Sequence, residues 1–235
     1  MIVAELEIFH SRPIAPTRRI ALGGRTLPVD PSPGGGGLLL AAIVAQTAER
    51  IDPDLREDLF HLIEDLDAGR RTPQPRVRHR FQDDQVGLIK STHRLVANGD
   101  ELSFEFEDEL GRPVQQALGA VYATAELQGE ERALIFNAIR NALLWVGDVD
   151  ARFITQVMGG RKASMAELMA WNDPVAWALD ILGLEADADS ASKRSVQRRF
   201  RTLLRDAHPD HGGGGDEAAA RIAELTEARD ILLAS

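Results

Sequence analysis

Two amphipathic helical patterns near the C-terminus constrain the fold of this chain more than any other feature. The first, residues 192–207 (SKRSVQRRFRTLLRDA), repeats apolar residues at helical spacing: Val196, Phe200, Leu203 and Leu204. The second, residues 216–234, does the same with Ile222, Leu225, Ala228, Ile231 and Leu232. Each helix must bury one apolar face, and the connection between them is short. The pattern therefore predicts an antiparallel helical hairpin.

The first of these helices carries basic residues away from its apolar positions. They are Lys193, Arg194, Arg198, Arg201 and Arg205. On an arbitrary helix such residues form a solvated face, and phosphate contacts are the other common use. A net charge of −10 for the 235 residues argues against nucleic acid as the main partner.

A shorter helical pattern precedes this hairpin. Residues 174–184 (PVAWALDILGL) place Val175, Leu179 and Leu182 at helical spacing, and Gly183 follows as a helix stop. Between the two long helices stands His208-Pro209-Asp210, followed by His211 and a glycine run.

These features together resemble the J-domain of DnaJ-type co-chaperones. That family has a short first helix ending near Leu-Gly, a basic second helix, a His-Pro-Asp loop and a third helix. The run FRTLLRDAHPDHGG and the stretch LTEARDILL are similar to the corresponding family segments. Ala178, Leu179 and Ala207 depart from it, because aromatic residues are usual at those positions.

The resemblance implies a partner and a site. The partner is a DnaK-type chaperone of the heat-shock 70-kDa class, whose ATPase a J-domain stimulates. Carried over by position, the residues that trigger ATP hydrolysis are His208, Pro209 and Asp210. The basic helix is steered toward an acidic surface of the chaperone by Arg194, Arg198, Arg201 and Arg205. Proline fixes φ, and aspartate accepts charge-assisted hydrogen bonds from a partner's arginine.

The first 150 residues predict an α+β domain. Residues 2–9 alternate as a half-buried strand does, and a short strand follows at 19–22. Further strands are expected at 76–81, where Val77, His79 and Phe81 alternate with arginines, and at 86–90. Asn98-Gly99 between 93–97 and 101–107 predicts an antiparallel hairpin with Leu102, Phe104 and Phe106 on one face. Helices are expected at 38–50, 53–66, 114–127 and 130–146, and a short one at 165–171.

Several residues of this domain admit a chemical interpretation. Gly34 to Gly37 before a helix offer amides to a phosphate, although a mobile loop over residues 22–37 is the simpler expectation. His79 and His93 lie on strands expected to be neighbours, and one interpretation is that they form a metal site or an acid-base pair with Glu105. The alternative interpretation is that both histidines have an ordinary structural role. Arginines at 70, 71, 76, 78 and 80 suggest a solvated strand face, neutralised by the acidic hairpin strand.

Composition narrows the possible classes. The absence of cysteine excludes disulfides and thiolate metal sites and suits a reducing cytoplasm. The N-terminus does not resemble a signal peptide, and the longest apolar run, residues 38–45, is too short to cross a bilayer. We therefore expect a cytoplasmic protein without a cofactor.

The sequence thus predicts an α+β domain (1–150), a connecting segment (151–173) and an all-α J-domain (174–235). The expected function is that of a non-enzymatic co-chaperone whose N-terminal domain recruits a client or sets a location. The alternative is an adaptor or enzyme in which the N-terminal domain carries the main function and the J-domain is accessory.

Overall fold

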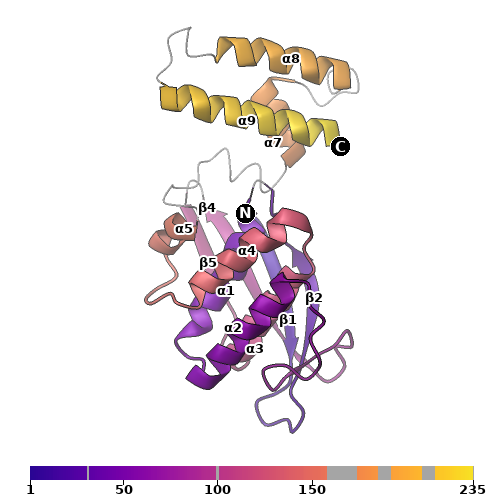
Figure 1. The fold of residues 1–235 in the computed structure, drawn as a ribbon, viewed down its shortest axis with the longest axis vertical. Coiled ribbons are helices and arrows are strands. Elements are labelled where there is room, and N and C mark those ends of the chain that lie inside the picture. Colours follow the sequence, from indigo (N-terminus) through magenta and orange to yellow (C-terminus); the bar gives the residue numbers. More distant parts are fainter. Residues whose placement is uncertain (31, 99–100, 158–173, 185–191, 208–214, 235) are drawn as a thin grey trace. The chain divides into compact units, whose positions relative to one another are not determined.

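The structure is a computed structural model that describes residues 1–30, 32–98, 101–157, 174–184, 192–207 and 215–234 (Figure 1). The chain divides into two compact units, Met1–Ser164 and Met165–Ser235. Each unit is considered by itself below.

The N-terminal unit is built on a five-stranded mixed sheet of order β3-β2-β1-β4-β5. Its strands are β1 (Ile2–His10), β2 (Arg19–Thr26), β3 (Arg80–Phe81), β4 (Ile89–Asn98) and β5 (Glu101–Phe106). All neighbouring strands are antiparallel except β2 and β3, which are parallel.

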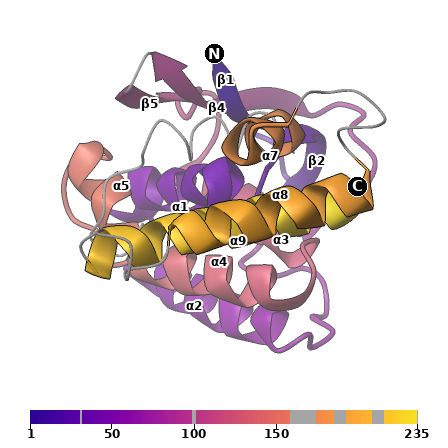
Figure 2. The same cartoon turned by 90° about the horizontal axis from the view of Figure 1, so that it is seen from above.

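Helices cover one face of this sheet in two layers, as Figure 2 shows from above. Helices α1 (Gly34–Ala48) and α3 (Pro113–Ala125) pack directly on the strands, and α2 (Pro53–Asp67) and α4 (Gly129–Ala142) pack on those two helices. The short helix α5 (Ala151–Val157) packs against α1. Since α1 lies between sheet and helices, nearly all of its residues are buried.

Alternation along β1 explains why the described helices cover one face of the sheet. Ala4, Leu6 and Ile8 are fully buried toward the helices. Glu5 and Glu7 point to the other face, where they pair with Arg94 (2.6 Å) and Lys90 (2.6 Å) of β4. The sheet thus has one apolar face and one charged face, as the alternation at residues 2–9 predicts.

Most predicted elements of this unit are confirmed, including the β4–β5 hairpin and the three half-buried side chains of β5. Two strand predictions are wrong in their bounds. Residues 76–79 form a tight turn in which Val77 and Arg78 have positive φ, so β3 begins only at Arg80. Residues 86–88 precede the strand, and β4 runs on from Ile89 through the predicted hairpin.

The loop predicted for residues 22–37 is also wrong at both ends. Strand β2 continues to Thr26, and α1 begins at Gly34, with all four glycines buried. A Cβ at Gly36 would lie 2.7 Å from the carbonyl carbon of Leu27, so the glycines allow the helix to start in close contact with that backbone.

The C-terminal unit is helical. It contains α7 (Pro174–Leu182), α8 (Lys193–Asp206) and α9 (Gly215–Ala234), and α8 and α9 lie side by side in opposite directions (Figure 1). The predicted helix at 165–171 lies outside the described residues. Within the described part of the chain, no helix is both long enough and apolar enough to span a membrane.

Candidate partner-binding surface

The end of α7 is fixed by a backbone motif that the sequence foreshadows with Gly183. The N–H of Leu184 donates to the carbonyl of Leu179 (2.8 Å), and the N–H of Gly183 donates to that of Asp180 (2.9 Å). Gly183 has φ +60°, a conformation that glycine adopts without a Cβ penalty. This pair of bonds is a Schellman motif, and it stops the helix at Leu182.

An arginine of α8 completes this helix end. Nε of Arg199 donates to the carbonyl oxygen of Leu182 at 2.8 Å. That oxygen is one of the carbonyls that a helix leaves without an internal partner, and a cation beside it also complements the helix dipole. Arg199 therefore joins α7 to α8.

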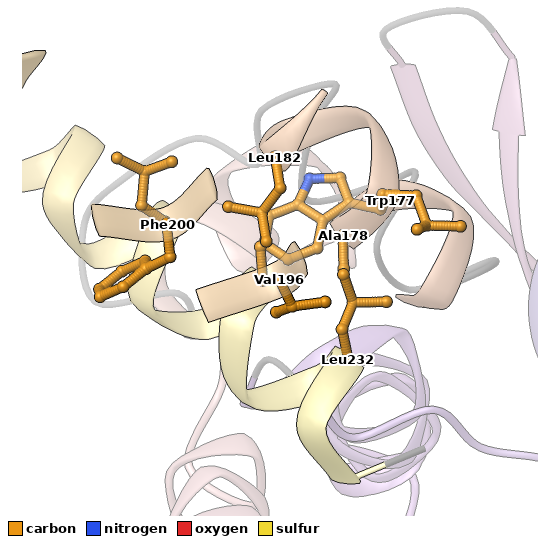
Figure 3. Close-up of a cluster of buried hydrophobic side chains, with 9 residues drawn as sticks. Trp177, Ala178, Leu182, Val196, Phe200 and Leu232 are labelled. Carbon is orange, nitrogen blue, oxygen red and sulfur yellow. The ribbon is translucent and has the colours of Figure 1, made fainter. Parts of the chain in front are cut away.

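A small apolar core holds the three helices together (Figure 3). Helix α7 contributes Trp177, Ala178, Leu179 and Leu182, α8 contributes Val196 and Phe200, and α9 contributes Leu225, Ala228 and Leu232. The Ala178 and Leu179 that depart from the J-domain pattern are thus core residues, next to a tryptophan that supplies aromatic bulk.

One cation of α9 lies on the edge of this core. The guanidinium carbon of Arg229 is 4.7 Å from the ring centroid of Phe200, a cation–π contact. Its Nε also donates to Asp230 at 2.8 Å. This contact ties α9 to α8 through the ring that the core leaves 8 % exposed.

The four predicted partner-binding arginines of α8 form a single exposed stripe. Arg194, Arg198, Arg201 and Arg205 follow one another at intervals of four, three and four residues, so they share one helix face. All four are exposed, whereas Val196 and Phe200 are buried on the opposite face. We call these four residues the arginine stripe.

In the described part of the chain, almost no acidic side chain neutralises the arginine stripe. Among the described residues, Arg194, Arg198 and Arg201 make no ion pair, and Arg205 lies 3.7 Å from its exposed neighbour Asp206. Helix α8 carries six basic residues and one acidic residue in a chain of net charge −10. The stripe is therefore a local cationic surface suited to an acidic partner.

The predicted trigger residues His208, Pro209 and Asp210 lie outside the described residues. Helix α8 is last helical at Asp206, and Ala207 closes it by donating its N–H to Leu203 (2.9 Å). The tripeptide follows this end directly in the chain.

The alternative metal or acid-base set in the N-terminal unit is not assembled. His79 precedes the edge strand β3, and His93 lies on β4, with β2 and β1 between those strands. Glu105 lies on the outer face of β5 and is 3.9 Å from Arg94. Among the described residues no group of three His, Asp or Glu side chains is placed to hold a metal ion. The expectation of neighbouring strands was wrong because strand order depends on contacts that are distant in sequence.

His93 belongs instead to a fully buried hydrogen-bonded chain. His93 Nε2 is 3.0 Å from Gln116 Oε1, Gln116 Nε2 is 3.0 Å from Ser91 Oγ, and Ser91 Oγ is 2.8 Å from His10 Nε2. His10 Nδ1 faces the carbonyl of Ser11 at 3.4 Å. One assignment of hydrogens satisfies every link: His93 donates to Gln116, Gln116 to Ser91, Ser91 to His10, and His10 to Ser11.

The environment of these hydrogen-bonded side chains favours the neutral form of both histidines. Burial lowers the pKa of His10 and of His93, although the Gln116 hydrogen bond opposes part of the effect on His93. The Ser91–His10 pair has the spacing of a nucleophile and base, but both side chains are 0 % exposed. A substrate cannot reach these two side chains, so the buried hydrogen-bonded series has a structural role.

The glycine run and two of the five arginines singled out from the sequence also make internal contacts. The amide of Gly36 donates to the carbonyl of Pro28 at 2.7 Å, which leaves it unavailable to a phosphate. Arg70 and Arg76 both pair with Asp65 of α2, at 2.8 and 2.5 Å. Neutralisation by the acidic hairpin strand is wrong, because β3 and β5 are opposite edges of the sheet.

Comparison with known protein families, with curated proteins and with solved structures found no match to this chain.

Proposed function

We propose that the chain is a J-domain co-chaperone that stimulates the ATPase of a DnaK-type chaperone. The observation that carries the proposal is the arginine stripe. It lies on α8 opposite the packed face, and the helix ends two residues before His208-Pro209-Asp210. The antiparallel pairing of α8 with α9 and the Leu182–Gly183 end of α7 also support it.

Two parts of this unit have different tasks in the proposed action. The stripe attracts an acidic surface of the chaperone and raises the rate of encounter. The tripeptide acts after docking: Pro209 restricts its backbone, and Asp210 accepts hydrogen bonds from a basic group of the partner. The first task sets the concentration of this chain needed for half-maximal stimulation, and the second sets the maximal stimulation of ATP hydrolysis.

In this proposal the N-terminal unit recruits a client or an anchoring protein. The alternative of an enzyme with an accessory J-domain gains no support from the described residues. The buried histidines of the N-terminal unit, which an enzyme would use, are at most 1 % exposed: His10, His79 and His93. Ser91 is also fully buried.

Steady-state ATP hydrolysis by a purified DnaK-type chaperone, with increasing amounts of the full chain, tests the proposal. The wild type is expected to accelerate hydrolysis and His208→Gln to lose that effect with its helical circular dichroism unchanged. His211→Gln, the same chemical change three residues later, serves as the matched control. No acceleration by the wild type contradicts the proposal.

A further inference from the structure

A loop at one end of the sheet in the N-terminal unit connects β1 to β2 (Figure 1). Its base is closed by two hydrogen bonds: the N–H of Ser11 donates to the carbonyl of Arg19 (3.0 Å), and the N–H of Arg19 donates to Ser11 Oγ (2.7 Å). Inside it, the N–H of Ala15 donates to the carbonyl of Arg12 (2.9 Å), which forms a tight turn. We call residues 11–18 the sheet-end loop.

Arginines from three segments of the chain gather around this loop. The N–H of Arg80 donates to the carbonyl of Arg18 (2.8 Å), and Nη2 of Arg112 donates to the carbonyl of Pro13 (2.9 Å). Burial and, to a smaller extent, the charges of Arg18 and Arg112 lower the pKa of His79, so both guanidinium groups lie near that imidazole. The loop, the residues around β3 and the start of α3 thus supply what we call the basic cluster: Arg12, Arg18, Arg78, Arg80 and Arg112.

The basic cluster keeps a positive charge. Among the residues with a described placement, none of its five arginines makes an ion pair. Of the acidic residues that are close in sequence, Asp108 pairs with Arg50, and the carboxylate of Asp84 accepts the N–H of Val86 (2.8 Å). Asp83 and Glu109 are exposed. The chain has a net charge of −10, but salt screens charges beyond about 8 Å, so the local charge decides what this surface attracts.

The sheet-end loop also holds an aliphatic side chain in water. Ile14 is 90 % exposed between the exposed prolines Pro13 and Pro16. Proline has no N–H, and the N–H of Ala15 is already bonded within the turn. Three of the four tip residues therefore have no N–H that needs water, and the tip loses little hydrogen bonding when it enters an apolar medium.

We propose that this end of the sheet docks peripherally on an anionic phospholipid bilayer. Ile14 inserts between the headgroups, and the basic cluster contacts the lipid phosphates, which guanidinium groups bind in bidentate geometry. Basic residues around an apolar anchor give reversible attachment to such a surface. A nucleic acid is a poorer match, because residues 11–18 contain no aromatic side chain on which a base could stack.

Co-sedimentation of the full chain with vesicles tests the apolar half of this proposal. The vesicles contain equal parts of phosphatidylcholine and phosphatidylglycerol, and control vesicles contain phosphatidylcholine alone. Wild-type protein is expected to bind the anionic vesicles and not the neutral ones. Ile14→Ser is expected to weaken binding about tenfold or more, because it removes the inserted side chain. Leu144→Ser, which changes another exposed aliphatic residue of this unit (73 %), is the matched control and should bind as the wild type does.

Charge reversal tests the basic half. The double variant Arg12→Glu and Arg80→Glu is expected to abolish vesicle binding, whereas Arg198→Glu with Arg201→Glu makes the same charge change in the arginine stripe and should leave it intact. Equal loss with both double variants overturns the proposal, and so does unchanged binding by Ile14→Ser. A wild type that binds polyuridylate but not the anionic vesicles also overturns it. No chaperone is present in these assays, so their outcome is independent of ATPase stimulation.

Discussion

At the scale of single residues, Arg199 differs from the arginines around it. It is one position from Arg198, but its guanidinium reaches back to α7, whereas Arg198 points to solvent as part of the stripe. Arg199→Ala removes the hydrogen bond to Leu182 and leaves that carbonyl to water. We expect a loss of about 1 kcal/mol in the free energy of unfolding of this unit.

Arg198→Ala is the control and should change the unfolding free energy by less than about 0.5 kcal/mol. Hydrogen exchange at the backbone amides of α8 and α9 reports this unit alone and is the appropriate measurement. Equal effects of the two substitutions would show that the Arg199–Leu182 contact does not stabilise the unit.

The buried histidines of the N-terminal unit predict how its stability depends on pH. Burial lowers the pKa of His10, His79 and His93 in the folded state below the ordinary value of 6.5. Below pH 6.5 the unfolded chain therefore binds protons that the folded unit does not, and the free energy of unfolding falls as pH falls. Each histidine contributes up to about 1.4 kcal/mol per pH unit in that window.

Urea unfolding between pH 8 and pH 5.5 measures this effect. Stability should be nearly constant above pH 7 and decline below pH 6.5. The His61→Gln variant changes an exposed histidine of α2 and should keep the same profile. A free energy of unfolding that stays constant down to pH 5.5 would mean that the folded unit accommodates these histidines in their protonated form.

At the scale of the elements, α8 has one buried face and one exposed face that carries the arginine stripe. Reversing two charges of the stripe, in the double variant Arg198→Glu and Arg201→Glu, leaves Val196 and Phe200 in place. We expect the concentration for half-maximal ATPase stimulation to rise about tenfold or more at low salt, with the maximal stimulation retained.

A matched control makes the same charge change in the other unit, with Arg71→Glu and Arg80→Glu, both exposed positions. This variant should stimulate as the wild type does. An equal loss with both variants would indicate that net charge, and not the stripe, attracts the chaperone.

The helices and strands differ in how far the local sequence predicts them. The β4–β5 hairpin and α2 follow from local signals, such as Asn98-Gly99 and the Asp52 side chain that accepts the N–H of Asp54. The helical start at Gly34 depends on close packing against Leu27, which no local pattern encodes. The separation of His79 from His93 depends on strand order for the same reason.

The candidate surface was more predictable than the basic cluster. The arginine stripe follows from helical periodicity alone, once residues 192–207 are taken as a helix. The basic cluster needs the loop after β1, the turn before β3 and the start of α3 to meet at one end of the sheet. The sequence suggests only a solvated strand face for the arginines at 78 and 80, and the hydrogen bond from Arg112 to Pro13 is visible only in the folded unit.

At the scale of the whole molecule, the two units differ in the surfaces that they present. The chain carries a net charge of −10, yet its C-terminal unit presents a cationic stripe opposite a compact apolar core. The N-terminal unit presents the basic cluster beside the exposed Ile14. The proposed co-chaperone thus has one surface for its chaperone partner and another for a membrane.

The most direct test of the central claim is single-turnover hydrolysis of ATP already bound to a DnaK-type chaperone. We expect the full chain to increase this rate several-fold, His211→Gln to increase it equally, and His208→Gln to leave the rate at its basal value. An unchanged rate with the wild type, or equal acceleration by His208→Gln, would contradict the account.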